Sequence, residues 1–131
     1  MTKEEMSQLY HLNKELEEQR RRSAQLESLV TSGTGRITGM PHSGKTSDMV
    51  ATCAVEIADL SECIDINTRR CFQELNRLSN FINNVTDSEM RRMLSFRYIS
   101  GLSWNQVVIS MGGNKSPNTL RMAVERFLES S

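Results

Sequence analysis

The chain has 131 residues, of which 16 are basic and 16 acidic, so its net charge gives no argument for or against nucleic-acid binding. Two prolines and 5% aromatic residues favour helix throughout. No segment approaches the ~20 apolar residues of a membrane-spanning helix. The N-terminus is charged from Lys3 onward. We therefore expect no membrane contact, no secretory signal and a cytoplasmic location.

Residues 3–30 form the first predicted helix. Seven positions follow one another at alternating steps of three and four residues, which is a heptad seam with two polar members. They are Leu9, Leu12, Leu16, Gln19, Ser23, Leu26 and Val30. The arginine run at residues 20–22 either contacts phosphates or forms a solvated face paired with nearby glutamates.

Residues 31–47 are rich in Gly, Ser and Thr, and they predict a loop at the tip of a hairpin. Within it, residues 39–46 (GMPHSGKT) match the phosphate-binding P-loop pattern, in which Lys45 and Thr46 reach phosphate and magnesium. That mechanism needs a buried β-strand directly before the loop, and residues 32–38 are not a hydrophobic strand. An ATPase rests on this motif alone, so we expect no nucleotide cofactor. Neither histidine has a nucleophile or carboxylate partner at a meaningful spacing, so we expect no enzyme activity.

A second helix is predicted over residues 48–85, with its own seam on steps of three and four residues. The seam is interrupted at Glu74 and consists of Val50, Cys53, Ile57, Leu60, Ile64, Asn67, Cys71, Leu78, Phe81 and Val85. The two seams predict a helical hairpin, in which residues 3–30 pack against the first part of 48–85. The three cysteines have no nearby histidine and predict reduced, buried thiols rather than a zinc site.

Residues 86–131 predict three short helices. Thr86 and Glu89 have the spacing of a capping box at the start of the first helix, which ends at Gly101. From residue 86 to 131 there are six basic residues against four acidic ones. The basic residues are Arg91, Arg92, Arg97, Lys115, Arg121 and Arg126, and the acidic ones are Asp87, Glu89, Glu125 and Glu129. This mild excess of positive charge permits DNA contact without demanding it.

Ser103 is predicted to cap the second of these helices, residues 104–111, which ends at Gly112 and Gly113. The third helix opens with Ser116 as its N-cap and Pro117 at its first position, where the missing N–H has no cost. A short helix, a glycine-containing turn and an amphipathic helix with a polar start are the layout of a DNA-binding helix-turn-helix.

The polar face of the last helix carries the candidate DNA contacts, since recognition helices contact base edges near their N-terminal end. The candidate base-reading residues are Asn118, Thr119, Arg121, Met122 and Glu125. Asn118 suits adenine and Arg121 suits guanine. The candidate phosphate contacts are Arg91, Arg92, Lys115 and Arg126. The alternative for each of these residues is a solvated surface position.

Several segments carry a family resemblance. Residues 91–98 (RRMLSFRY), 101–108 (GLSWNQVV) and 116–128 resemble region four of bacterial sigma factors. Residues 37–42 (ITGMPH), 56–60 (EIADL), 71–76 (CFQELN) and 97–104 resemble a family of small proteins from phages and prophages of gram-positive bacteria, grouped with ArpU-like transcriptional regulators. The resemblance implies a phage-encoded DNA-binding regulator in a bacterial host, without ATPase activity.

The sequence thus predicts an all-α protein with two domains. A coiled-coil-like helical hairpin occupies residues 1–65, and a sigma-region-four-like helix-turn-helix domain occupies residues 66–131. The leading hypothesis is a transcriptional regulator of phage late promoters that binds double-stranded DNA, with a homodimer through the hairpin and host RNA polymerase as further candidate partners. The alternative is a phage packaging or structural adaptor, whose helix-turn-helix recognises a packaging site or a protein.

Overall fold

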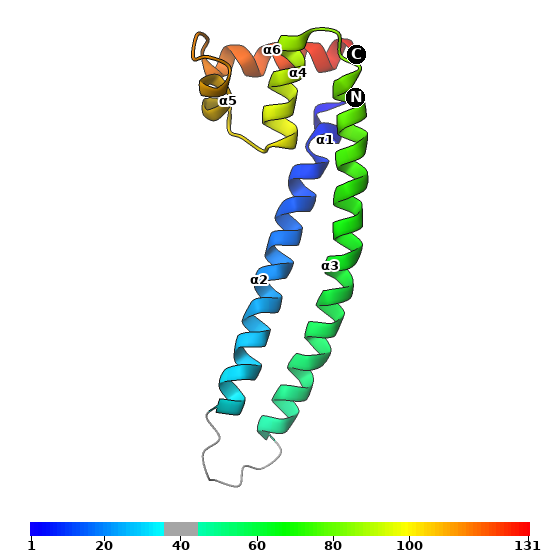
Figure 1. Ribbon diagram of the computed structural model, residues 1–131, viewed down its shortest axis with the longest axis vertical. Coiled ribbons are helices and arrows are strands. Elements are labelled where there is room, and N and C mark those ends of the chain that lie inside the picture. The colour runs from blue at the N-terminus through cyan, green and yellow to red at the C-terminus, as the bar shows by residue number, and fades with distance from the viewer. Residues whose placement is uncertain (36–44) are drawn as a thin grey trace. The chain divides into compact units, whose positions relative to one another are not determined.

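The computed structural model describes residues 1–35 and 45–131 of the chain. Throughout these two ranges the chain is helical or forms short connections, and no β-strand occurs in them, which confirms the all-α prediction (Figure 1). The residues group into two compact units, Lys14–Arg69 and a second unit of Met1–Asn13 with Arg70–Ser131. Residues 1–13, which the predicted division placed in the hairpin domain, thus belong to the unit that holds the C-terminal helices.

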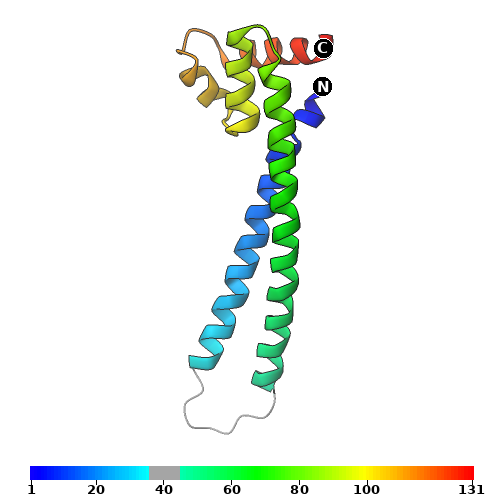
Figure 2. The same cartoon turned by 45° about the vertical axis from the view of Figure 1, so that its right-hand side comes forward.

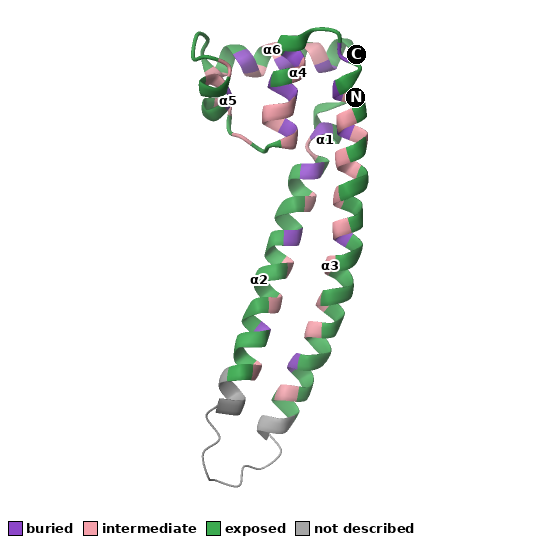
Figure 3. Ribbon diagram, viewed as in Figure 1, coloured by how far each residue is buried: buried purple, intermediate pink, exposed green. Residues whose placement is uncertain are grey.

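The unit Lys14–Arg69 is a hairpin of two antiparallel helices, α2 (Gln8–Gly35) and α3 (Lys45–Asn83), which both continue into the other unit. Between residues 16 and 30 and between residues 50 and 67, every predicted seam position is buried or half-buried, and nearly every other residue is exposed (Figure 3). Leu16, Leu26 and Cys53 are its buried apolar members. The heptad seam is therefore confirmed, and it is used within one chain.

One polar pair lies inside this seam. Asn67 is only 3% exposed, and its Nδ2 donates a hydrogen bond of 2.9 Å to Oε1 of Gln19 on the facing helix. A buried amide needs such a partner, because leaving it unpaired costs the full desolvation of the group. A single polar layer in an apolar seam also fixes the register of two helices, because any shifted pairing would bury an unpaired amide.

The outer face of α3 in this unit is acidic. Between residues 48 and 69 it carries five exposed acidic side chains and one exposed basic one: Asp48, Glu56, Asp59, Glu62, Asp65 and Arg69. Of these, Glu56 pairs with Arg22 of α2 at 3.4 Å. Cys63 is also exposed on this part of α3, which corrects the prediction of three buried thiols.

The predicted loop at residues 31–47 is helical at both ends, since α2 continues to Gly35 and α3 begins at Lys45. The hydroxyl of Thr31 donates a 2.9 Å hydrogen bond to the carbonyl oxygen of Glu27, which is compatible with a continuing helix. Residues 39–44 of the P-loop match lie outside the described residues.

The second unit is built around one apolar core. Three segments enclose it: the short helix α1 (Lys3–Met6) with the start of α2, the last turns of α3, and the C-terminal helices α4 (Ser88–Leu94), η1 (Ser95–Ile99), α5 (Trp104–Ser110) and α6 (Pro117–Ser130). Its buried members are Met6, Leu9, Leu78, Ile82, Val85, Met90, Met93, Leu94, Tyr98, Val107, Leu120, Val124 and Leu128. Both α4 and α5 pack against α6, which crosses α4 (Figures 1 and 2).

The N-terminal residues do not form one helix from residue 3 to 30 as predicted, because the helix is interrupted at Ser7. Thr2 caps α1 in a capping box with Glu5, and the hydroxyl of Ser7 donates to the carbonyl of Lys3 at 2.9 Å. Such back-bonding by serine bends a helix. The break lets Met6, which is fully buried, reach the core of the C-terminal unit.

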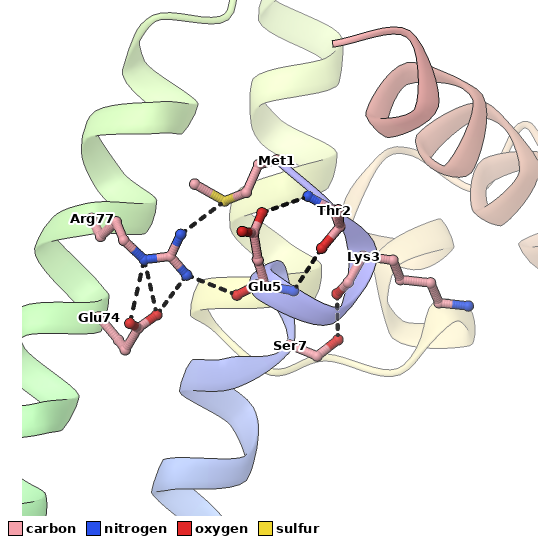
Figure 4. A network of polar contacts seen from close by, with 7 residues as sticks. All are labelled: Met1, Thr2, Lys3, Glu5, Ser7, Glu74 and Arg77. Carbon is pink, nitrogen blue, oxygen red and sulfur yellow. Dashed lines mark hydrogen bonds and ion pairs between the residues drawn. The ribbon is translucent and has the colours of Figure 1, made fainter.

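Arg77 of α3 fastens α1 to this unit (Figure 4). Its Nη2 pairs with Glu74 at 2.8 Å and donates to the carbonyl oxygen of Glu5 at 3.0 Å, while its Nη1 donates to the sulfur of Met1 at 3.6 Å. Glu74, the polar interruption of the predicted seam, thus holds the arginine that receives the N-terminus. The pKa of the Glu5 carboxyl lies below its usual value, chiefly because the backbone N–H of Thr2 donates to it.

Candidate nucleic-acid interface

The helix α4 begins at Ser88 and is capped by Asp87 rather than by the predicted capping box at Thr86. Oδ1 of Asp87 accepts a 3.1 Å hydrogen bond from the backbone N–H of Glu89. Aspartate is at least as good an N-cap as threonine, and its charge also favours the positive end of the helix dipole. Glu89 consequently does not close a capping box and is left to pair with Lys115 at 3.2 Å.

The cap of α5 and the turn after it follow the prediction. Ser103 and Gln106 form a reciprocal capping box, in which the Ser103 backbone N–H donates to Oε1 of Gln106 at 2.9 Å. After α5, Gly112 and Gly113 have φ angles of 105° and 76°, a region that favours glycine. The N–H of Gly113 donates to the carbonyl of Val108 at 2.8 Å, which closes the end of the helix.

The start of α6 also forms as predicted, with Ser116 as N-cap and Pro117 in the first turn. The hydroxyl of Ser116 accepts from the backbone N–H of Thr119 at 3.2 Å and lies 2.7 Å from the Thr119 hydroxyl. On the inner side Leu120, Val124 and Leu128 are buried. The caps and this buried stripe fix which side chains of α6 face outward.

Three of the predicted base-reading residues are joined into one stripe, here called the paired stripe. Nη2 of Arg121 donates to Oδ1 of Asn118 at 2.6 Å, and its Nη1 pairs with Oε1 of Glu125 at 3.2 Å. The same oxygen of Glu125 also pairs with Nζ of Lys3 from α1 at 3.1 Å. The pKa of Glu125 is lowered, chiefly by the hydrogen bond from Lys3 and then by the charges of Lys3 and Arg121, so the carboxylate is ionised at neutral pH.

The other outward residues of α6 form a second stripe, here called the open stripe. It consists of Thr119, Met122 and Arg126, which follow one another at steps of three and four residues, and all three are exposed. Met122 is 41% exposed, and Arg126 makes no hydrogen bond or ion pair with any residue that the structure describes. The five candidate base-reading residues are therefore split between a stripe joined by ion pairs and hydrogen bonds and an exposed stripe, in which the Thr119 hydroxyl contacts that of Ser116.

Two of the four candidate phosphate contacts are engaged with the backbone. Nη1 of Arg91 donates to the carbonyl of Val85 at 2.9 Å and so braces the turn before α4. Arg92 is exposed, and its guanidinium lies 5.8 Å from the centre of the Phe96 ring and donates to the carbonyl of Ser110 at 3.4 Å. Arg92 links α4 to the end of α5, which the sequence pattern did not indicate.

The other two candidate phosphate contacts are Arg126, which lies on α6, and Lys115, which precedes it. Lys115 lies just before the helix, and its ion pair with Glu89 is exposed on both sides, so it contributes little stability. Lys3, in contrast, was not among the predicted site residues. It meets Glu125 across 122 positions of sequence, and no local pattern could have indicated that contact.

Comparison with known proteins gives no further assignment to this interface. None of the helices in the described part of the chain is long and apolar enough to cross a membrane. No family model matches the chain, and no curated protein or solved structure is significantly similar to it.

Proposed function

We propose that the protein is a DNA-binding transcriptional regulator, encoded by a phage and active in the bacterial cytoplasm on phage late promoters, and that α6 enters the major groove. The open stripe is the observation that supports this most. It exposes Thr119, the flexible apolar side chain of Met122, and an arginine that pairs with no described residue, on a helix whose start is fixed by a Ser-Pro cap. Preorganised caps and an exposed polar face suit a recognition helix.

Each stripe has its own task in this proposal. In the open stripe Arg126 contacts phosphate, while Thr119 and Met122 contact base edges, the latter through a thymine methyl group. In the paired stripe, Arg121 and Asn118 exchange their mutual hydrogen bond for guanine and adenine edges. Lys3 keeps Glu125 paired during that exchange, which limits the cost of releasing Arg121.

Such regulators bind repeated half-sites as dimers, and we infer a homodimer here as well. Because the seam is occupied within one chain, the dimer contact uses the outer surface of the hairpin, where Val55 is 61% exposed. Sedimentation of the intact chain at tens of micromolar should give the dimer mass, and Val55→Glu should give the monomer mass. A monomeric wild-type chain would rule out the dimer.

The proposed DNA interface can be tested once bound sites have been mapped genome-wide in induced cells. Arg126→Ala should weaken binding to all sequences alike and lower the salt dependence by about one unit, since one phosphate contact is lost. Arg121→Ala should relax sequence preference, at a cost of roughly 1–3 kcal/mol for the mapped site. Arg69→Ala, which removes an exposed charge from the hairpin, is the matched control and should change neither property.

A packaging or structural adaptor is the second candidate, and one observation favours it. Ile109 on α5 is 75% exposed, and a large apolar side chain at that exposure suits a protein partner better than a phosphate backbone. Host RNA polymerase is a candidate for the same contact in a regulator. A regulator changes output from a late promoter, whereas an adaptor changes only DNA encapsidation. Absence of DNA binding at low salt, where phosphate attraction is strongest, would favour the protein-binding adaptor.

A further inference from the structure

A cleft opens between the start of α2, the helix η1 and the start of α5. The residues that line it include Tyr10, His11, Arg97, Tyr98, Ser103 and Gln106. None of the lining residues is acidic. All of them belong to the unit of Met1–Asn13 and Arg70–Ser131. None was predicted as a site residue, because the cleft exists only after the N-terminal residues have folded back onto the C-terminal helices.

Tyr98 gives the first indication of a ligand. It is only 6% exposed, yet its hydroxyl makes no hydrogen bond with the residues that the structure describes. No side-chain oxygen or nitrogen among those residues is both fully buried and unpaired, so the hydroxyl reaches the surface, and the cleft is a hollow that Tyr98 lines. Burial raises the pKa of Tyr98, the charge of Arg97 opposes this rise and the charges of Glu125 and Glu4 add to it, so the hydroxyl keeps its proton and is a hydrogen-bond donor at neutral pH.

Arg97 supplies a fixed positive charge. Its Nη1 donates to the carbonyl of Leu102 at 2.9 Å, and its guanidinium lies 4.9 Å from the centre of the Trp104 ring. These two contacts hold the plane of the guanidinium. Arginine has five N–H donors, and only one of them is engaged in a hydrogen bond with the described residues, so the rest remain available to a ligand.

The capping box of α5 adds two donors. Oε1 of Gln106 accepts from the backbone N–H of Ser103, which turns the side-chain NH₂ group of Gln106 outward. The Ser103 hydroxyl accepts from the backbone N–H of Gln106 at 3.3 Å, which leaves its own proton free to donate. The donors thus come from two segments, η1 and α5, and face a lining without carboxylates.

We propose that this cleft binds a phosphate group. An excess of donors, with one fixed cation and no carboxylate in the lining itself, favours an oxyanion. Donors from two different segments suit the four oxygens of a tetrahedral phosphate better than the two in-plane oxygens of a carboxylate. The same chemistry would recognise the phosphate of a small ligand or that of a nucleic-acid backbone. The proposal does not rest on the reading of DNA by α6.

Trp104 makes the test direct, because it is the only tryptophan of the chain and its ring contacts Arg97. The intact protein is titrated with inorganic phosphate against chloride at constant ionic strength, and tryptophan fluorescence is recorded. We expect a saturable change that is about tenfold weaker in affinity for Tyr98→Phe and for Arg97→Gln, since each removes a charge-assisted hydrogen bond. Arg69→Gln, which removes an exposed charge from the hairpin, is the control and should titrate like wild type. Tyr98→Phe removes only a hydroxyl that bonds none of the described residues, so it should fold normally.

A second arm measures duplex DNA binding by the same four proteins as a function of salt. A response to inorganic phosphate that both cleft variants weaken supports a small phosphorylated ligand. No response to inorganic phosphate, but weaker DNA binding in both cleft variants regardless of sequence, supports a backbone phosphate. If Tyr98→Phe and Arg97→Gln match wild type in both arms, or if neither probe binds, the proposal is wrong. The phosphate arm is independent of DNA, so failure of the α6 interface alone leaves it intact.

Discussion

The polar pair inside the hairpin seam gives a quantitative prediction. Asn67→Leu removes the donor that Gln19 uses and places an apolar side chain against the Gln19 oxygen. An unsatisfied buried polar group costs about 1–3 kcal/mol. Because Gln19 is half-buried and can turn toward water, we expect a loss near the lower end, about 1 kcal/mol. Urea denaturation followed by circular dichroism would measure it.

The double variant Gln19→Leu/Asn67→Leu measures the coupling energy between the two amides. With both amides replaced, no unpaired amide is left in the seam, so the double variant should be at least as stable as wild type, although neither single change is. Ser23→Leu is the control, because Ser23 is a half-buried polar seam position whose replacement breaks no hydrogen bond with the described residues, and it should not destabilise. Additive effects of the two single changes would refute the coupling. Loss of the polar layer should also broaden the oligomer distribution in sedimentation, since register is less constrained.

Other predictions concern the C-terminal unit and the loop. Leu94→Ala should lower the free energy of unfolding by about 2–5 kcal/mol, because this side chain is fully buried. Asp87→Ala should cost about 1 kcal/mol in urea denaturation through loss of the α4 cap, whereas Thr86→Ala should cost less than about half of that. Because the pKa of Tyr98 is raised in the folded state, its contribution to stability is fully present below the unfolded tyrosine pKa, near 10, and is lost as pH rises through the folded pKa. The melting temperature of Tyr98→Phe should therefore fall less steeply with alkaline pH than that of wild type. Lys45→Ala should leave ATP hydrolysis at the background of wild type; a magnesium-dependent turnover that the change abolishes would overturn this expectation.

Periodicity was sufficient to predict the helices because their apolar positions repeat over many turns. Leu16 and Leu26 on one helix and Asn67 on the other are buried where the seam places them. The local sequence was less sufficient to predict which residue caps a helix. Thr86 and Asp87 are both good caps in adjacent positions, and sequence alone does not decide which adopts the extended backbone of an N-cap. The bend at Ser7 accompanies the burial of Met6, which is a tertiary effect.

The candidate site was predictable only as far as it lies on one helix. Helical spacing places Thr119, Met122 and Arg126 outward, and they are exposed. Whether an outward side chain is engaged depends on partners that are distant in sequence, as Lys3 is from Glu125. The cleft lined by Arg97 and Tyr98 could not be predicted for the same reason, because three segments that are distant in sequence meet there. The π-helix η1, in which the N–H of residue 100 bonds the carbonyl of residue 95 at 2.9 Å, also carried no sequence signal.

The acidic outer face of α3 has a consequence for how the protein behaves in solution. Residues 48–69 carry five acidic side chains and one basic one, a net charge of four negative units, and since the whole chain is neutral the remainder carries four positive units. Copies of a neutral molecule do not repel one another through their net charge. The acidic region of one copy attracts the basic region of another over the Debye length, which is about 30 Å at 0.01 M salt but 8 Å at 0.15 M. The protein should therefore be least soluble near neutral pH in dilute buffer, and added salt should dissolve it.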